Sequence, residues 1–277
     1  MHRRLPIVAI AICAAACSAT QTGRAAYLAE FQTAEQAHRP IRPITAFEPA
    51  TSLDEAYAIQ HQLVERKLAR GARIAGYRGG LMSATSLRGR NVSEPLIGVQ
   101  FLSGRQRSPA TISFARYRHP AIEVKIGFVF GRELPPGKVT IEQLHHAVEA
   151  VVPIIDVPDI SYADPLHYSA VDMVAADISA ADYVEGQRSL RCTDLDAETM
   201  TLTRDGAIIT RGKGTDSLGG VWQSLDTVVD LVRRHGYRIR RGDLVLTGKL
   251  GGKVDVGEGL YEAHFSCLGQ VAVRFRA

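Results

Sequence analysis

After Gly76 the sequence consists mainly of short apolar runs, and these limit the fold more than any other feature. Such runs, rich in β-branched and aromatic residues and bounded by turn residues, are typical of β-strands. The hairpin signal Arg204-Asp205-Gly206 interrupts the fourth of them. A strand-rich core is therefore expected. The runs are LIGVQF, AIEVKIGFVF, AVEAVVPIID, TMTLTRDGAIITRG, DLVLTGKL, YEAHFSC and QVAVRFRA.

The residues before Gly76 have a helical pattern instead. In SLDEAYAIQHQLVERKLARG the apolar residues recur on one helical face. Ser52 stands in the N-cap position with Glu55 three residues later, and Gly71 stands where the helix should end. Two further helices are expected at 142–152 and 225–235. The pattern predicts an α+β fold in a single domain, 26–277, with a helical cap at 26–98 and a β-rich core at 99–277.

The first 19 residues have the pattern of an export signal. MHRR is basic, the next 12 residues are apolar, and CSAT follows. The apolar run is shorter than the roughly 20 residues that span a membrane. Cleavage fits either a site after Ala19 or one before Cys17, which would then be a lipidated N-terminus. The sequence therefore predicts an exported protein, either free in the periplasm or lipid-anchored at a bacterial envelope membrane.

Composition and motifs exclude several classes of function. The chain is 45% hydrophobic and 22% charged, as expected for an ordinary folded core, and its net charge is only +4. Its basic clusters are short and have no interleaved aromatic residues, so nucleic-acid binding is not expected. No P-loop or nucleotide-binding glycine pattern is present, so no nucleotide cofactor is expected. Cys192 and Cys267 fit either a disulfide or two buried thiols.

One strand carries the residues of greatest chemical interest. In AIEVKIGFVF successive side chains alternate between two faces, so Glu123 and Lys125 share a face. Asp156 ends another apolar run, VVPIID, where a carboxylate can serve as an oxygen ligand or a base at the mouth of a pocket. The sequence predicts an acidic pocket around Glu123 and Asp156 with Lys125 inside it. A solvated surface ion pair is the alternative.

The order of several segments resembles the 2-keto-4-pentenoate hydratase branch of the fumarylacetoacetate hydrolase superfamily, which includes 2-hydroxydienoate hydratases and 4-oxalocrotonate decarboxylases. The resemblance covers 56–275 and implies a mixed β-roll, as in the C-terminal part of that superfamily. It also implies a magnesium or manganese ion on three carboxylates, which chelates a 2-oxo acid and stabilises its enolate. The segments are HPAIE, IGFVFGRELP, PIIDVPD, DMVAADIS, GKGTDSLGGVWQSLDTVVDLVRRHG, RRGDLVLTGKLGG and LGQVAVRF.

The resemblance places two metal ligands and one departure. Glu123 matches the first ligand and Asp156 the third, while Lys125 falls on the second. An ammonium beside a magnesium site would oppose the metal, which makes a metal cofactor doubtful here. Two interpretations follow. Either the Lys125 ammonium lies between Glu123 and Asp156 in the metal's place, or the site has lost its chemistry.

Other matched positions complete the candidate site. Arg78 replaces the family's active-site lysine, and a guanidinium can hold a carboxylate but cannot act as a base. Lys249 either restores the missing amine or faces solvent. The resemblance implies catalytic roles for Glu123, Lys125, Asp156, Arg78 and Lys249. It implies substrate contacts from Arg78, Asp177, Thr247 and Lys249.

The function expected from these residues is that of a hydratase or related lyase. Its substrate would be a small 2-oxo acid or its enol, of the 2-hydroxydienoate type. A homo-oligomer is expected because members of the family often form one. The alternative is an exported, non-catalytic small-molecule-binding or accessory protein that retains the fold.

Overall fold

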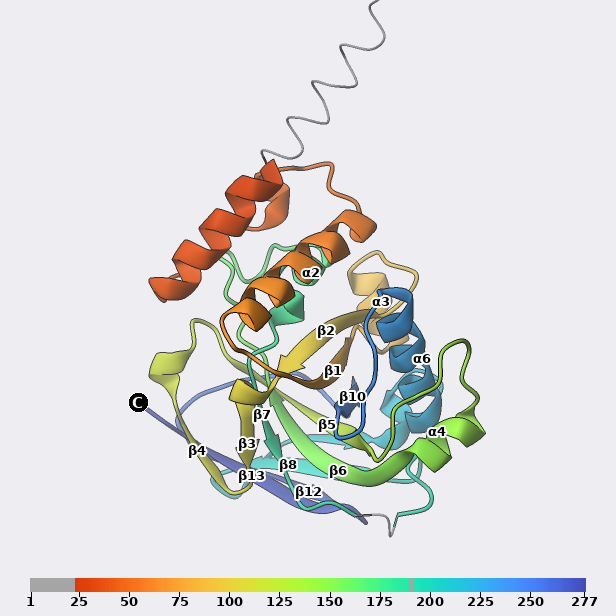
Figure 1. The fold of residues 1–277 in the computed structure, drawn as a ribbon. Helices are drawn as coiled ribbons and strands as arrows, with labels where there is room; N and C mark the ends of the chain where they lie inside the picture. The colour runs from red at the N-terminus through yellow and green to blue at the C-terminus, as the bar shows by residue number, and fades with distance from the viewer. Residues whose placement is uncertain (1–22, 190–191) are drawn as a thin grey trace, which may run out of the picture.

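A computed structural model describes residues 23–189 and 192–277 (Figure 1). The export signal expected at 1–19, with both of its cleavage sites, lies outside the described residues. Among the residues that are described, no helix has the length and apolar character needed to cross a membrane.

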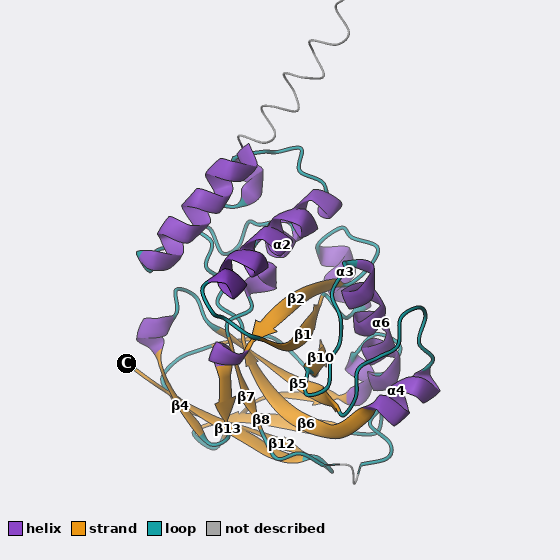
Figure 2. Ribbon diagram, in the orientation of Figure 1, coloured by secondary structure: helices purple, strands orange, loops and turns teal. Residues whose placement is uncertain are grey.

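An eight-stranded mixed sheet forms the centre of the molecule (Figures 1 and 2). Its order is β2-β1-β10-β5-β6-β7-β3, with β11 paired to the end of β5. β1 with β10 and β3 with β7 pair in parallel, and the other pairs are antiparallel. The strands are β1 Ile74–Gly80, β2 Leu96–Phe101, β3 Arg105–Arg107, β5 Ala121–Phe130, β6 Val148–Val157, β7 Asp182–Glu185, β10 Leu244–Lys249 and β11 Val254–Asp255.

A five-stranded sheet of order β4-β13-β12-β8-β9 lies against the first. Val124 of β5 and Val271 of β13 belong to one buried apolar cluster, so the two sheets share a core. The predicted hairpin joins β8 to β9 through Asp205 and Gly206, which both have positive φ, as a two-residue type I′ turn requires. The strands are β4 Ala110–Ser113, β8 Thr199–Arg204, β9 Ala207–Lys213, β12 Gly259–Phe265 and β13 Gly269–Arg276.

Helices cover one end and one side of the sheets (Figure 2). A helix at 23–36, α2 and α5 form the cap, while α4 and α6 flank the sheet. The helices are α2 Leu53–Ala69, α3 Ala84–Gly89, α4 Ile141–Ala147, α5 Ala170–Ala175 and α6 Val221–Arg234. Short 3-10 turns are η1 Ile44–Ala46, η2 Leu102–Gly104, η3 Phe114–Arg116, η4 Asp177–Ser179 and η5 Gly214–Asp216.

The local signals read for α2 are confirmed. Ser52 and Glu55 form a reciprocal capping box, which satisfies two of the free N–H groups at the start of the helix. The helix ends at Ala69, and Gly71 follows with a φ of +89°, a conformation that glycine adopts without strain. The α+β class with a mixed sheet is also confirmed.

Two boundaries differ from the sequence prediction. The helical cap was expected to extend to 98, but β1 and β2 already belong to the central sheet. The sequence of β1, IAGYRGG, does not predict a strand because glycine has a low strand propensity. This segment becomes a strand through its pairing with β10. The helix expected at 142–152 ends at Ala147, where the valine-rich segment of β6 begins.

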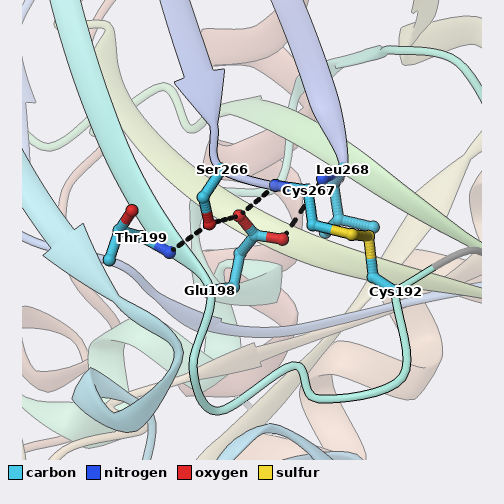
Figure 3. Close-up of a disulfide and its surroundings, with 6 residues drawn as sticks. All are labelled: Cys192, Glu198, Thr199, Ser266, Cys267 and Leu268. Atoms are coloured by element: carbon cyan, nitrogen blue, oxygen red, sulfur yellow. Dashed lines mark hydrogen bonds between the residues drawn. A yellow bond between two sulfur atoms is a disulfide. The ribbon is translucent and has the colours of Figure 1, made fainter.

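Cys192 and Cys267 are joined in a disulfide (Figure 3). The sequence was compatible with either a disulfide or two buried thiols, and the structure shows the disulfide. The bond ties the segment after β7 to the turn between β12 and β13. The adjacent Glu198 carboxylate accepts the backbone N–H groups of Cys267 at 2.9 Å and Leu268 at 3.2 Å, which fixes this turn further.

Removing this crosslink should destabilise the fold. The two cysteines are 75 residues apart, and the loop-closure entropy of such a crosslink is on the order of 4 kcal/mol. The double variant Cys192→Ser/Cys267→Ser should therefore lose about that much free energy of unfolding, measured by urea titration. Reductant should lower the melting temperature of the wild type and leave that of the variant unchanged. Equal stability of the two proteins would contradict the structural role.

Candidate active site

The register between the central strands β5 and β6 places two carboxylates next to each other in the site. Glu123 of β5 and Asp156 of β6 are direct cross-strand partners. Like charges in this arrangement repel each other and destabilise a sheet. The Asp156 side chain is fully buried, so water cannot screen the repulsion. The pair therefore requires cations close by.

Lys125 supplies the first cation, from the same face of β5 as Glu123. Its Nζ lies 2.9 Å from Asp156 Oδ2 and 3.1 Å from Glu123 Oε2. It also donates to the backbone oxygen of Gly79 at 3.1 Å. The contact with Gly79 has hydrogen-bond geometry, and the two contacts with the carboxylates are ion pairs. Lys125 thus bridges the two carboxylates as a buried, fixed positive charge.

Arg78 of β1 supplies the second cation. Its Nη2 lies 2.8 Å from Asp156 Oδ2 and 3.3 Å from Glu123 Oε2. Its Nη1 donates to the backbone oxygen of Ile178 at 3.4 Å. The expected contact with a substrate carboxylate would therefore compete with protein carboxylates that Arg78 already holds. Two cations and two carboxylates make the cluster neutral, which is the condition for burying it.

The surrounding charges control the ionisation of Glu123. Burial by itself would raise its pKa, but Lys125, Arg78 and Lys249 outweigh this effect and lower the pKa from 4.5 to about 2. Glu123 is therefore ionised at neutral pH. A carboxylate with so low a pKa is a weak base, so its main role in the cluster is electrostatic.

A small cavity of about 90 Å³ opens onto this cluster. Arg78, Glu123 and Lys125 line it, and Lys249 and Lys253 add two more ammonium groups. Lys249 is the cross-strand partner of Lys125. Among residues 23–189 and 192–277, no carboxylate oxygen lies within 4.0 Å of either added ammonium. The remaining lining is largely apolar and includes Met82, Tyr168 and Ile178.

Two residues expected at the substrate are engaged elsewhere. The Thr247 hydroxyl donates to the backbone oxygen of Ile126 at 3.0 Å, and the Asp177 carboxylate accepts the Val99 N–H at 2.8 Å. Neither side chain lines the cavity. Burial raises the pKa of Asp177 to about 7. Their expected substrate contacts therefore have no support in this geometry.

The cavity wall beside Asp177 has an unusual backbone. Asp177, Ile178 and Ser179 all have left-handed φ values, of 54°, 42° and 59°. Non-glycine residues rarely adopt this conformation, and strain of this kind concentrates at functional sites. The turn directs the Ile178 oxygen to Arg78 and its side chain into the cavity wall.

The residues of the cluster do not fit a divalent metal. Lys125 and Arg78 each already lie within ion-pair distance of both Asp156 and Glu123. A Mg²⁺ site needs several oxygen ligands at short range, and here an ammonium lies among them. Adding a doubly charged ion to a neutral buried cluster would leave two positive charges uncompensated.

The sequence interpretation missed two participants. Gln100 of β2 donates to Asp156 Oδ1 at 3.4 Å, and Lys253 lines the cavity. A second lysine in GKLGGK was the only signal for Lys253. Gln100 could not be found from sequence because its contact depends on the order of strands in the sheet.

The low pKa of Glu123 predicts acid sensitivity. A carboxylate whose folded pKa is depressed adds stability above its unfolded pKa, and this stability is lost as the pH falls toward the folded value. Between pH 5 and pH 3 the wild type should lose about 2 kcal/mol more unfolding free energy than Glu123→Gln. Urea titrations at both pH values measure this difference. Parallel losses in the two proteins would show that Glu123 is not held by the cations.

Comparisons with known proteins agree with this architecture. The chain is 35% identical over 254 residues to a 2-keto-4-pentenoate hydratase of Paraburkholderia phymatum, covering 91% of this chain and 95% of the relative. It is 32% identical over 247 residues to one of Paraburkholderia xenovorans, covering 88% and 91%. No model of a protein family matches the chain.

A solved structure gives the same result for the fold. The 4-oxalocrotonate decarboxylase from Pseudomonas putida G7, complexed with calcium and acetate, superposes with a TM-score of 0.84 at 25% identity. The alignment covers 92% of this chain and 98% of that one. Fold, segment order and sequence identity over nearly the whole length agree, and the chain belongs to the 2-keto-4-pentenoate hydratase family of the fumarylacetoacetate hydrolase superfamily.

Proposed function

We propose that this protein is a lyase-type enzyme that acts on a small 2-oxo acid or its enol, with the Lys125 ammonium in the place that a metal takes in the family. One observation carries the proposal. A neutral buried cluster lies beneath a small cavity whose other ammonium groups, Lys249 and Lys253, have no carboxylate within 4.0 Å in the described part of the chain. Hydratases and a decarboxylase among the relatives support a lyase reaction.

The unpaired lysines are suited to bind the substrate. A 2-oxo acid presents a carboxylate and a carbonyl oxygen, and both accept hydrogen bonds. Lys125 is already held between two carboxylates, so Lys249 and Lys253 are the donors proposed to reach these oxygens from the cavity. Lys125 and Arg78 act from beneath as fixed positive charges. Negative charge that develops on the enol oxygen is stabilised by preorganised charges of this kind.

Lys249 is the group proposed to move a proton. Hydration or decarboxylation of a 2-oxo acid passes through an enol, so a proton must leave or reach carbon during the reaction. Glu123 is a weak base because of its low pKa, and Arg78 stays protonated. Lys249 lines the cavity, is partly exposed and has no ion pair with any of the described residues, so it is the side chain that we assign to this proton transfer.

We further infer that the protein functions outside the cytoplasm. The basic and apolar start of the chain has the pattern of an export signal. The Cys192–Cys267 disulfide supports this inference, because disulfides persist in oxidising compartments such as the periplasm. Lipidation at Cys17 and assembly into a homo-oligomer stay predictions from the sequence.

Turnover in the presence of a chelator tests the proposed function. The ultraviolet absorbance of 2-hydroxypenta-2,4-dienoate should decay with the enzyme present, at the same rate with and without EDTA. Lys249→Met should slow the decay by about 100-fold or more, the effect of losing a general acid–base group. Lys138→Met, the same change at an exposed lysine outside the cavity, should have no effect. Binding of the dienol without any turnover would instead support the non-catalytic alternative.

Restoring the family's carboxylate tests the role of Lys125. Lys125→Glu leaves three carboxylates around the site, so the variant should bind Mn²⁺ in calorimetry and gain thermal stability from it. Wild type should show neither effect. Lys125→Met, which removes the ammonium without adding a ligand, is the matched control and should not bind Mn²⁺. Tight, stoichiometric binding of Mg²⁺ or Mn²⁺ by the wild type would refute the substitution of metal by lysine.

A further inference from the structure

A second cavity, of about 410 Å³, lies between the helical cap and the central sheet. One wall separates it from the candidate active site. Residues 158–161 alternate between the two cavities. Pro158 and Ile160 line the active-site cavity. Asp159 and Ser161 line the second cavity. Ser179, from the left-handed turn, lines both. The second cavity is thus a separate space and not an extension of the site around Lys125.

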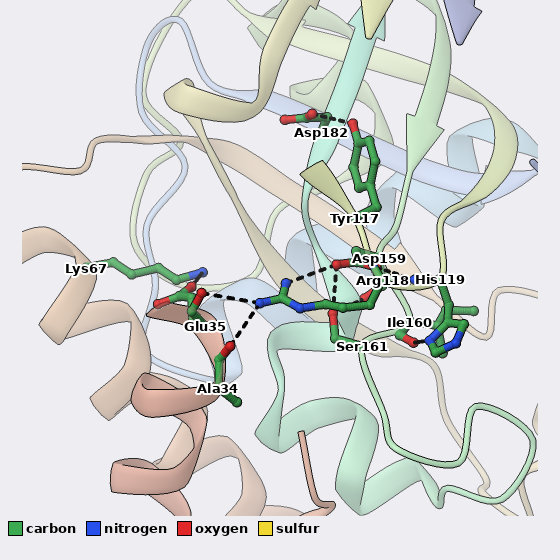
Figure 4. A network of polar contacts seen from close by, with 10 residues as sticks. All are labelled: Ala34, Glu35, Lys67, Tyr117, Arg118, His119, Asp159, Ile160, Ser161 and Asp182. Atoms are coloured by element: carbon green, nitrogen blue, oxygen red, sulfur yellow. Dashed lines mark hydrogen bonds and ion pairs between the residues drawn. The ribbon is translucent and has the colours of Figure 1, made fainter. Parts of the chain in front are cut away.

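The basic groups inside this cavity are neutralised by the protein. Arg118 Nη1 lies 3.1 Å from Asp159 Oδ2, and its Nη2 donates to the backbone oxygens of Ala34 and Glu35 (Figure 4). Arg116 lies 3.3 Å from an Asp182 oxygen. Each guanidinium has its own carboxylate, so these pairs leave no surplus charge to attract a ligand.

Two further basic residues of this cavity, Lys67 of α2 and Arg70 just after it, lack a close carboxylate partner among the described residues. Lys67 Nζ and Arg70 Nη1 share one carboxylate, that of Glu35, at 3.9 Å and 3.8 Å. These distances are too long for hydrogen bonds. No hydrogen-bond acceptor for either side chain is found in the part of the chain that the structure describes. Two cations with one distant carboxylate leave a net positive charge, and their N–H groups can take a ligand in place of water.

Apolar side chains lie beside these donors. Phe31, Ile41 and Phe101 line the same cavity. Lys67 Nζ lies 4.9 Å from the centre of the Phe101 ring, so the charged group and the apolar surface are adjacent. A ligand that satisfies both would carry one anionic group on a flat apolar body, with the anion at Lys67 and Arg70 and the body against the phenylalanine rings.

We propose that this cavity is a binding site for an aromatic monocarboxylate. The carboxylate accepts from Lys67 and Arg70, where it supplies the negative charge that Glu35 provides only at a distance. The ring packs against Phe31 and Phe101. The site needs no residue of the Lys125 cluster, so it stands whether or not the proposed lyase activity does.

Calorimetric titration with benzoate tests the proposal without any measurement of turnover. The wild type should bind one benzoate, and benzamide, which has the same ring without the charge, should bind at least about tenfold more weakly. Lys67→Met should weaken benzoate binding by roughly the same factor. Arg70→Met provides an independent variant, and circular dichroism checks that both proteins fold.

Two control variants locate the bound benzoate. Lys138→Met, at an exposed lysine away from the cavity, should leave the affinity unchanged. Lys249→Met, in the candidate active site, should also leave it unchanged. Absence of benzoate binding by the wild type would overturn the proposal. So would an affinity that falls with Lys249→Met and not with Lys67→Met, because benzoate would then occupy the other cavity.

Discussion

The cross-strand pairing of Glu123 with Asp156 is the constraint on which the rest of the site depends. Two carboxylates forced together in a buried part of the sheet cannot both stay ionised without cations. Lys125 of β5 and Arg78 of β1 supply these cations. The ion pairs of the cluster therefore join three strands of the sheet, β1, β5 and β6. Removing one partner of such a buried cluster typically costs about 3 to 5 kcal/mol, because a charge is left uncompensated.

The same constraint decides how chemistry can occur here. The resemblance implies three carboxylates around a divalent ion, whereas this chain has two carboxylates and two fixed cations. Both arrangements put positive charge next to a bound 2-oxo acid. They differ because Lys125 is already held by ion pairs with both carboxylates and by a hydrogen bond to the Gly79 oxygen. Under the proposed function, direct contact with the substrate comes from Lys249 and Lys253, which line the cavity.

Part of this site could be predicted from sequence and part could not. Alternation along one strand was sufficient to put Glu123 and Lys125 on one face, and segment order was sufficient to match Asp156 to the same site. The engagement of Arg78 with the cluster could not be predicted, because it depends on β10 separating β1 from β5. Thr247 illustrates the same limit: its segment matched the family, but its hydroxyl is used within the sheet. Likewise, the strand pairing of IAGYRGG is a tertiary property that its local composition conceals.

The most direct test of the central claim is a crystal structure of the wild type grown with excess Mn²⁺, with data collected at the manganese absorption edge. We predict no anomalous peak between Glu123 and Asp156, and electron density for the Lys125 ammonium within hydrogen-bond distance of both carboxylates. A manganese peak at that position, with the Lys125 side chain displaced, would contradict the account.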